Sequence, residues 1–362
     1  MKFLSDIKVG LTDKVVIVRT DLNIQSGEEK NAFRLVSALP TIKFLLKKGA
    51  KVVITSHRGR PNKKDSKLSL KIFKPVLEKR LGQKIVFIGD FNFTKARSLI
   101  ASSSNKLFLL ENVRFVPAEE KNSPVFAKGL ASLGDIYVND AFAVSHRANA
   151  TVSAITRFLP SYAGLLMEKE IRNLRRLNSP KRPFVAIVGG AKVSDKIKLI
   201  RHFLKKADYL LVGGGIANTF FLADNIPVGN SIYDKEAVPF VKSVMKNPKI
   251  IKPIDGVVAN KKILDVGAET SKLFKNYVKK ARTIVWNGPL GLIENKKFSK
   301  GTADLAKVIS ESGAFSVVGG GETADFIIES GLEDKISFLS TGGGAMLEYL
   351  SGDKLPGLEA LK

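Results

Sequence analysis

Short apolar runs rich in valine and isoleucine recur along the whole chain, and they do not alternate with polar residues. In the first half they occupy Val15–Arg19, Lys51–Ser56, Lys84–Gly89, Lys106–Asn112 and Asp135–Asp140. In the second half they occupy Phe184–Gly190, Tyr209–Gly215, Thr283–Gly288, Phe315–Gly321 and Ile336–Thr341. Continuous apolar runs of this length are typical of strands that are buried on both faces of a parallel sheet.

Segments with helical spacing of apolar residues lie between these runs. Leu39–Gly49 has Pro40 in a position suited to a first turn and Gly49 as a stop. Leu273–Ala281 and Gly301–Gly313 show the same spacing. The alternation of strands and helices predicts an α/β fold with right-handed crossovers.

The number of predicted strands indicates more than one domain. About ten strands are too many for one comfortable open sheet, so we expect two doubly wound parallel-sheet domains. The best boundary lies in Tyr162–Pro183, which begins as an amphipathic helix and ends in a basic stretch with prolines. The chain of 362 residues is long enough for each half to bury a full core.

Composition narrows the class of protein. Apolar residues make up 44% and charged residues 26%, which is ordinary for a soluble globular protein. Cysteine is absent, so disulfides, thiolate metal sites and a thiol nucleophile are excluded. No apolar stretch is long enough to span a bilayer, and neither end reads as a secretory signal or an anchor. We expect a cytoplasmic protein without a membrane partner.

The formal net charge of +25 is the unusual bulk property. Three explanations remain open: a solvated lysine-rich surface, nucleic-acid binding, or the steering of anionic metabolites towards a basic cleft. The lysines are spread over the whole chain, no zinc finger is possible without cysteine, and there is no clear RNA-binding aromatic motif or basic arm. We therefore favour the solvated surface and expect no nucleic-acid partner.

The polar signatures that follow the apolar runs change character halfway along the chain. The early ones carry charged side chains: RTDLN (Arg19–Asn23), SHRGRP (Ser56–Pro61), ENVRF (Glu111–Phe115) and VNDAF…SHR (Val138–Arg147). In open parallel sheets, ligands bind beyond the carboxyl ends of the strands, where all these signatures lie. Each arginine alone is most simply a surface charge, but several at neighbouring strand ends can converge on one phosphate. Asp21 and Asn23 either hold a substrate hydroxyl or form a turn.

The later signatures are rich in glycine instead, which leaves main-chain N–H groups accessible to a ligand. They are VGGAK (Val188–Lys192), VGGGI (Val212–Ile216), WNGPLG (Trp286–Gly291), VGGGET (Val318–Thr323) and STGGGA (Ser340–Ala345). One such turn is ordinary turn chemistry, but their repetition before helix starts predicts an anion held by main-chain N–H groups. Neither GxxxxGK[ST] nor GxGxxG occurs, so a nucleotide is held in another way.

Lys192 and Lys196 follow the first of these glycine turns. Their i, i+4 spacing predicts that both lie on one face of the first helical turns, where a lysine either reaches phosphate oxygens or is solvated. The two kinds of signature together predict one anion held by cationic side chains and another held by the backbone. This pattern is typical of a two-substrate phosphoryl-transfer enzyme.

The ordered motifs resemble those of the phosphoglycerate kinase family nearly end to end. They run from VVIVRTDLN through SHRGRP, LLENVRF, YVNDAFAVSHRANAT, RPFVAIVGGAKVSDKI, TIVWNGPLGLIE and VVGGGET to STGGGAMLEYLSGDKLPG. The resemblance implies two Rossmann-like domains joined by an interdomain helix and hinge. It implies a 3-phosphoglycerate-binding domain at 1–163, an interdomain helix and nucleotide-binding domain at 164–346, and a C-terminal tail 347–362 that packs back on the first domain.

The resemblance also implies a reaction, its cofactor and its residues. The reaction is 1,3-bisphosphoglycerate + ADP ⇌ 3-phosphoglycerate + ATP with Mg²⁺, catalysed by a monomer. The substrate set carried over by position comprises Asp21, Leu22, Asn23, Arg34, His57, Arg58, Gly59, Arg60, Arg114 and Arg147. The nucleotide set comprises Gly190, Ala191, Lys192, Lys196, Gly214, Gly215, Gly267, Asn287, Pro289, Gly291, Glu294, Gly320, Gly321, Glu322 and Thr323.

Within these sets, the resemblance gives Arg34 and Lys192 the catalytic role of neutralising the transferring phosphoryl group. It makes Glu322 the ligand of the nucleotide-bound Mg²⁺, although the family has Asp at this position. Met346 stands where the family has a small Ser, and the stretch between Gly215 and Trp286 is shorter than usual. The alternatives are a kinase-like fold that has lost activity and binds nucleic acid, and a relative that acts on another acyl phosphate.

Overall fold

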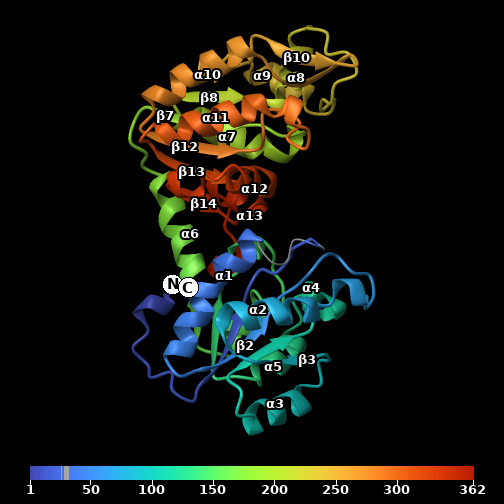
Figure 1. Cartoon of the computed structure of the whole chain (residues 1–362), viewed down its shortest axis with the longest axis vertical. Coiled ribbons are helices and arrows are strands. Elements are labelled where there is room, and N and C mark those ends of the chain that lie inside the picture. Colours follow the sequence, from blue (N-terminus) through green and yellow to red (C-terminus); the bar gives the residue numbers. More distant parts are fainter. Residues whose placement is uncertain (26, 28–31) are drawn as a thin grey trace. The chain divides into compact units, whose positions relative to one another are not determined.

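The computed structural model describes residues 1–25, 27 and 32–362. The chain divides into two compact units, each of which is described by itself below. Unit 1 comprises Met1–Ile171 and Lys354–Lys362, and unit 2 comprises Arg172–Asp353. Each unit contains a six-stranded parallel sheet with helices packed against it (Figure 1), so the predicted α/β fold of two doubly wound sheets is confirmed.

The sheet of unit 1 has the strand order β3-β4-β2-β1-β5-β6. Its strands are β1 (Val15–Arg19), β2 (Lys51–Thr55), β3 (Ile85–Ile88), β4 (Leu107–Leu110), β5 (Ile136–Asn139) and β6 (Ser161–Ala163). Its helices are α1 (Phe33–Lys47), α2 (Lys74–Leu81), α3 (Phe93–Ser102), α4 (Pro117–Glu120), α5 (Pro124–Ala131) and α14 (Pro356–Glu359). All pairings in this sheet are parallel, so the carboxyl ends of its strands share one edge.

Alternate side chains of the unit 1 strands enter two different cores. Val16 and Val18 pack with Leu35 and Ile42 of α1 on one face. Ile17 packs on the other face, with residues of α3 and α5. This burial on both faces explains why the strands read as continuous apolar runs.

The sheet of unit 2 has the strand order β14-β13-β12-β7-β8-β9. Its strands are β7 (Phe184–Val188), β8 (Tyr209–Val212), β9 (Ile250–Ile251), β12 (Thr283–Asn287), β13 (Phe315–Gly319) and β14 (Phe338–Ser340). Its helices are α7 (Ile197–Lys206), α8 (Gly214–Ala223), α9 (Val238–Val244), α10 (Ala268–Lys280), α11 (Lys300–Glu311), α12 (Gly321–Glu329) and α13 (Gly344–Leu350). Trp286 of β12 is fully buried in the core that the sheet forms with α10, α11 and α12.

The connection between the units is the helix α6 (Leu165–Arg176), because the boundary between Ile171 and Arg172 falls inside it. Its first turn is held by two side chains of unit 1. The Thr41 hydroxyl accepts a hydrogen bond from the N–H of Leu165 at 3.0 Å. Asp140 Oδ1 accepts hydrogen bonds from the N–H groups of Leu166 and Met167 at 2.9 and 3.2 Å. These N–H groups have no partner within the helix, so the two side chains act as its cap.

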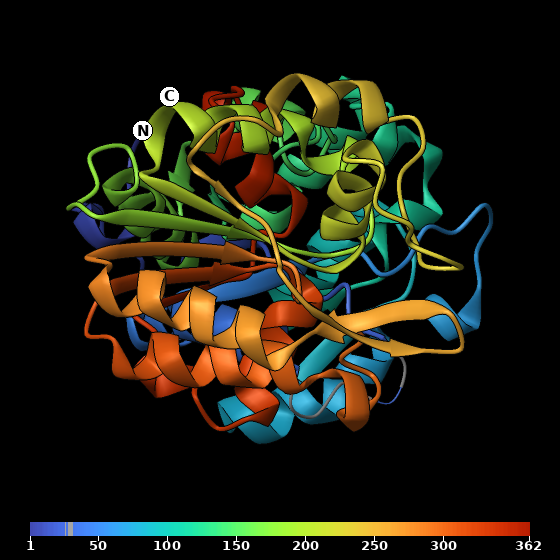
Figure 2. The ribbon, with the colours of Figure 1, turned by 90° about the horizontal axis from the view of Figure 1, so that it is seen from above.

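All ten predicted strand positions carry strands, and four further strands were missed. β6 and β9 are short, and β10 (Gly256–Ala259) and β11 (Lys262–Val266) form an antiparallel hairpin, orange in Figure 2. β10 is a short run, GVVA, and its residues are largely exposed, so it lacks the burial on both faces that the predicted strands share. The start of α1 was also wrong: the helix begins at Phe33 and contains Pro40 in its interior, because apolar residues on both sides of Pro40 pack on the sheet.

Met346 has a clear structural role. It lies in α13, and its side chain is completely buried. A Cβ placed on Gly319, the last residue of β13, would lie 2.1 Å from the Met346 sulfur. The thioether therefore packs directly on the backbone of Gly319, and a side chain at position 319 would collide with it. Within the described residues, the structure contains no helix that is long and apolar enough to cross a membrane.

Candidate active site

The charged signatures of unit 1 lie at the carboxyl ends of four adjacent strands. Asp21 and Asn23 follow β1, the loop 57–60 follows β2, Arg114 follows β4, and Arg147 follows β5. These strands are neighbours in the order β4-β2-β1-β5. The sheet topology therefore brings segments that are far apart in the sequence to one edge.

Arg34, in the first turn of α1, is held by the end of β1. Its Nη1 donates to Asp21 Oδ2 at 2.9 Å and to the carbonyl of Asn23 at 3.4 Å. The Arg34 side chain is 28% exposed, whereas the Asp21 side chain is 4% exposed. The buried carboxylate therefore fixes the direction of a guanidinium that still reaches solvent.

Asn23 and Leu22 are part of the same loop structure. Asn23 Oδ1 accepts a hydrogen bond from the N–H of Gly59 at 2.8 Å, and the N–H of Asn23 donates to Asp21 Oδ1 at 3.1 Å. Leu22 is buried, and its N–H donates to the Ser56 hydroxyl at 2.8 Å. These bonds connect the loop after β1 to the loop after β2.

His57 lies at the centre of the cationic side chains. Burial lowers the pKa of His57 well below its ordinary value. The positive charges that lower this pKa further belong to Arg19, Arg114, Arg34 and Arg147. The His57 ring is therefore neutral at pH 7, and it lies within reach of the charges of all four guanidinium groups.

The tautomer of His57 follows from its neighbour. Nη2 of Arg19 lies 3.1 Å from His57 Nδ1. A guanidinium can only donate, so Nδ1 accepts and Nε2 carries the ring proton. Nε2 can then donate a hydrogen bond to an anion.

Arg114 and Arg147 approach this cluster from two other strand ends. Arg114 Nη1 donates to the carbonyl of Gly59 at 2.7 Å, and burial lowers the pKa of Arg114 to about 10. Arg147 is half-buried, and its Nε donates to His146 Nε2 at 3.3 Å. Arg114 remains charged at neutral pH, since even this lowered pKa lies well above 7.

Arg58 and Arg60 take different positions although only Gly59 separates them. Arg58 is buried; its Nε donates to the carbonyl of Ile24 at 2.9 Å, and its guanidinium lies 5.4 Å from the centre of the Phe73 ring. Arg60 is exposed. Gly59 has φ +64, a conformation that favours glycine, and this turn sends the two arginines in different directions.

Arg19 is a member of the cluster that sequence reasoning missed. It is 1% exposed, and its Nε donates to the Thr151 hydroxyl at 2.9 Å. That hydroxyl in turn donates to Glu119 Oε1 at 2.5 Å. Arg19 is thus connected to the Glu119 carboxylate through the Thr151 hydroxyl, and this holds its guanidinium in place beside His57. The sequence did contain one signal for the role of Arg19, namely its position at the end of an apolar strand, directly before the TDLN signature.

The glycine turns of unit 2 line two adjoining cavities. One, of about 560 Å³, is lined by Gly190, Ala191, Lys192, Asp195, Lys196, Asn287, Gly288, Gly320, Gly321, Glu322 and Thr323. The other, of about 450 Å³, contains Gly214, Gly215, Pro289, Gly291 and Glu294 in its lining and shares Gly190, Ala191 and Glu322 with the first. Of the predicted nucleotide set only Gly267 lines neither cavity, because it precedes the first turn of α10 and faces Asp255.

Lys196 connects two of the turns. Its Nζ donates to the carbonyl of Gly189 at 2.6 Å and lies 3.4 Å from the carbonyl of Asn287. Burial lowers the pKa of Lys196 to about 8, and the nearby carboxylates of Glu322 and Asp195 oppose this shift. Lys192 is exposed and precedes the first helical turn, which begins at Ser194. The predicted common helical face is therefore wrong, because the glycine turn extends past Lys192.

Two side chains hold the turns after β12 and β13 together. Asn287 Nδ2 donates to the carbonyl of Gly319 at 2.8 Å, and the Thr323 hydroxyl accepts from the N–H of Gly288 at 3.0 Å. Gly320 precedes the first turn of α12 and has φ +104, which side chains rarely adopt. Gly320 and the first three residues of α12 line the cavity, and N–H groups at a helix N-terminus can bind an anion.

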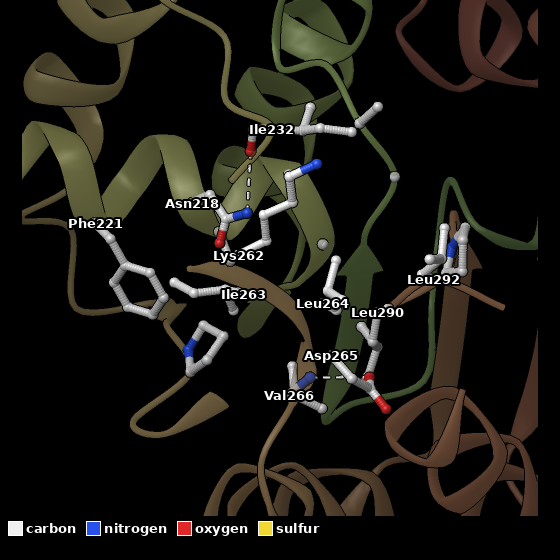
Figure 3. A pocket seen from close by; sticks show the side chains of 18 of the residues that line it. Asn218, Phe221, Ile232, Lys262, Ile263, Leu264, Asp265, Val266, Leu290 and Leu292 are labelled. Atoms are coloured by element: carbon white, nitrogen blue, oxygen red, sulfur yellow. Dashed lines mark hydrogen bonds between the residues drawn. The ribbon is translucent and has the colours of Figure 1, made fainter. Parts of the chain in front are cut away.

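The cavity of 450 Å³ has an apolar wall that the sequence did not reveal (Figure 3). Its apolar lining comprises Phe221, Ile232, Pro253, Ile263, Leu264, Val266, Leu290 and Leu292. These residues come from α8 and the loop after it, the hairpin strand β11, and the segments that follow β9 and β12. Only the folded chain brings them together, and none belongs to a recognisable local motif. Such a wall suits one flat, largely apolar group.

The resemblance implies Mg²⁺, and the residues present fit it. No cluster of three or more His, Cys, Asp or Glu suited to a metal occurs within residues 1–25, 27 and 32–362. Mg²⁺ that is bound with a nucleotide needs only one or two carboxylates, because phosphates supply further oxygens. Glu322 is an exposed carboxylate in the first turn of α12, in the cavity that Lys196 also lines.

Comparison with known proteins agrees with this geometry. A model of the phosphoglycerate kinase family matches residues 4–353. The phosphoglycerate kinase of Coprothermobacter proteolyticus is 43% identical over 100% of this chain and 99% of its own length. That of a Wolbachia endosymbiont of Brugia malayi is 41% identical over 97% of this chain and 96% of its own.

Solved structures give the same result. The phosphoglycerate kinase of Pyrococcus horikoshii matches with a TM-score of 0.90 and 33% identity, covering 100% of this chain and 98% of the other. That of Coxiella burnetii matches with a TM-score of 0.84 and 37% identity, covering 99% and 98%. Sequence and fold thus agree over essentially the full length, and this chain belongs to the phosphoglycerate kinase family.

Proposed function

We propose that this chain catalyses the reversible glycolytic transfer of a phosphoryl group from 1,3-bisphosphoglycerate to ADP, giving 3-phosphoglycerate and ATP. The observation that carries the proposal is the position of His57. Burial and four arginines from separate parts of unit 1 all act on this one side chain. Like charges gathered this closely repel one another, so the group is suited to a small, highly charged anion.

The phosphorylated acid is proposed to bind to this group. His57, Arg60, Arg114 and Arg147 bind its phosphate, while Asp21 and Asn23 bind its hydroxyl. Leu22 and Gly59 hold the two loops at the spacing that the acid requires. Arg58 is proposed to support the loop instead of contacting the acid, because its guanidinium binds the carbonyl of Ile24.

The nucleotide is proposed to bind in the two cavities of unit 2. The apolar wall of the smaller cavity takes the base, and Pro289, Gly291 and Glu294 lie beside it. The glycine turns and lysines around the larger cavity take the phosphates. The N-terminal N–H groups of α8 and α12 support this assignment, since helix N-termini bind phosphate.

The chemistry needs neither a general base nor a covalent intermediate. An oxygen of the ADP β-phosphate attacks the acyl phosphorus, and the bond between that phosphorus and the carboxyl oxygen breaks, so the carboxylate leaves. Both oxygens involved are already deprotonated at pH 7, so positioning and charge neutralisation suffice. Arg34 and Lys192 are proposed to neutralise the transferring group. Mg²⁺, held by Glu322 together with the nucleotide phosphates, would supply further positive charge.

The two substrate sets belong to different units, so the proposal includes a hinge motion that brings the bound substrates together. α6, through which the chain passes from unit 1 to unit 2, is the natural candidate for this hinge. We further propose that the enzyme works as a monomer in the cytoplasm, as a glycolytic enzyme of this family would.

A coupled assay tests the proposal directly. The purified protein is supplied with 1,3-bisphosphoglycerate, ADP and Mg²⁺, and ATP formation is followed; the reverse reaction is started from 3-phosphoglycerate and ATP. We expect turnover in both directions. A folded protein that forms no ATP at saturating substrate would overturn the proposal. Salt-sensitive affinity for RNA in such an inactive protein would instead support the nucleic-acid alternative.

A further inference from the structure

The apolar wall of the smaller cavity in unit 2 cannot distinguish one purine from another. Aliphatic and aromatic side chains contact the faces of a base, and all purines have similar faces. Discrimination requires a hydrogen-bonding group that faces the edge of the ring, where adenine and guanine differ. The polar side chains of this cavity are therefore the candidates for such a group.

Most polar side chains in the lining are already engaged or exposed. The carboxylate of Asp255 accepts from the N–H groups of Glu269 and Thr270 at 3.0 and 2.8 Å. That of Asp265 accepts from the N–H groups of Val266 and Gly301 at 2.9 and 2.8 Å. The remaining charged side chains of the lining are exposed, namely Lys262, Glu294 and Glu322.

Asn218 differs from all of these. It lies in α8, one turn after Gly214, and it is only 4% exposed. Its Nδ2 donates to the carbonyl of Ile232 at 3.0 Å. Its Oδ1 has no hydrogen-bond partner among the residues that the structure describes, and this atom is not buried away from solvent.

The bond to Ile232 determines which way the amide faces. A carbonyl can only accept, so the NH₂ group must face Ile232 and Oδ1 must lie on the other side of the amide. Figure 3 shows this arrangement, with the nitrogen towards Ile232 and the oxygen turned away from it. An accessible acceptor is thus held in a fixed orientation at the wall of this cavity, on a side chain that is otherwise buried.

We propose that Asn218 selects adenine nucleotides by accepting a hydrogen bond at Oδ1 from the 6-amino group of the base. Guanine and hypoxanthine carry a carbonyl oxygen at the same position, so two acceptors would face each other. A base that covers Oδ1 displaces water from it, and an acceptor that then faces another acceptor gains no hydrogen bond in return. The inference rests on the proposed role of this cavity as the base site.

The test compares ADP, GDP and IDP in the coupled assay. IDP shares the 6-carbonyl of GDP but lacks its 2-amino group. The comparison of IDP with GDP therefore separates the effect of the 2-amino group from that of the 6-carbonyl. For the unaltered protein we expect kcat/KM for ADP to exceed that for GDP and IDP by about tenfold or more. In Asn218→Leu we expect kcat/KM for ADP to fall by about tenfold while the values for GDP and IDP change by less than about threefold. The KM for 1,3-bisphosphoglycerate should stay unchanged.

Two further variants keep the test decisive. Asn218→Ala leaves room for a water on the Ile232 carbonyl and replaces the leucine variant if that one does not fold. Phe221→Leu alters the apolar wall of the same cavity and should lower kcat/KM for all three nucleotides by a similar factor. A preference for ADP that persists in folded Asn218→Leu or Asn218→Ala would overturn the proposal. So would a wild-type preference of GDP over IDP that disappears in these variants, because Oδ1 would then meet the 2-amino group.

Failure of this inference is distinguishable from failure of the proposed function. If the reaction itself does not occur, no nucleotide gives a phosphorylated product. The inference is then tested by calorimetric binding of ADP and GDP to the full chain and to Asn218→Leu. Equal loss of affinity for both nucleotides would overturn it, and a selective loss for ADP would support it.

Discussion

Arg34 donates a hydrogen bond to Asp21 over 2.9 Å, and this contact connects the first turn of α1 to the carboxyl end of β1. The carboxylate is buried while the guanidinium remains partly exposed. Asp21 therefore orients Arg34 without removing it from solvent, which suits a cation that must meet a charged ligand.

Replacement of Arg34 should affect catalysis far more than folding. We expect Arg34→Ala to lower kcat by about 10²–10³-fold, since one charge directed at the transferring phosphoryl group is removed. Arg97, an exposed arginine of α3, provides the matched control, and Arg97→Ala should keep kcat within about twofold. Steady-state kinetics and thermal melting are measured together. A folded Arg34→Ala enzyme with near-normal kcat would exclude the catalytic role.

The lowered pKa of Lys196 predicts a pH dependence of nucleotide binding. The pKa of this lysine is about 8, so the side chain loses its charge as the pH rises from 7 to 9.5. We expect the dissociation constant of ADP to increase several-fold over this range, because a charge-assisted contact with phosphate is lost. In Lys196→Met, binding should be weak throughout and nearly independent of pH.

Lys198, in the first turn of α7 and two residues after Lys196, serves as the control for this measurement. It is largely exposed and pairs with Asp353 at 2.9 Å. Lys198→Met should reproduce the wild-type dependence of ADP binding on pH, as followed by isothermal titration. If Lys196→Met kept that dependence too, another group would be responsible for it.

Glu322 should determine how much Mg²⁺ the reaction needs. Glu322→Gln removes the negative charge but keeps the length of the side chain. We expect the Mg²⁺ concentration for half-maximal activity to rise by about tenfold, as for the loss of one charged contact. Glu329 is an exposed carboxylate at the other end of α12, so Glu329→Gln is the matched control and should leave the Mg²⁺ requirement unchanged. Identical Mg²⁺ titrations for both variants would show that Glu322 is not the ligand.

The buried Asp140 predicts a pH dependence of stability. Burial raises the pKa of Asp140 to about 7 from its ordinary value of 3.8, so folding takes up a proton between these pH values. The free energy of unfolding should therefore fall as the pH rises from 4 to 7, by an amount on the order of 4 kcal/mol. Asp140→Asn is neutral at every pH and still accepts from the N–H groups at the start of α6, so it should lack this fall.

Urea unfolding at pH 5 and pH 8 measures this difference. Asp334→Asn, at an exposed position, should keep the wild-type change in the free energy of unfolding. If wild type and Asp140→Asn changed in parallel between the two pH values, Asp140 would not titrate in this range.

Much of the fold was predictable because its pattern is local. A strand buried on both faces must be apolar along its whole length, so Val15–Arg19 and Phe184–Val188 were evident in the sequence. The hairpin strand β10 is largely exposed and carries no such constraint, so it was missed. α1 extends through Pro40 because its apolar face packs on the sheet, which outweighs the local preference of proline for a first turn.

The sequence by itself indicated the two kinds of candidate anion site, since glycine turns and basic signatures are each contained in a few consecutive residues. Only the tertiary structure decided which side chains meet. It placed the buried Arg19 against His57, turned Arg58 towards Phe73 while Arg60 stayed exposed, and assembled an apolar cavity around Asn218 from separate elements. The physical reason is that strand order and side-chain direction depend on packing between distant segments, and no short stretch of sequence contains that information.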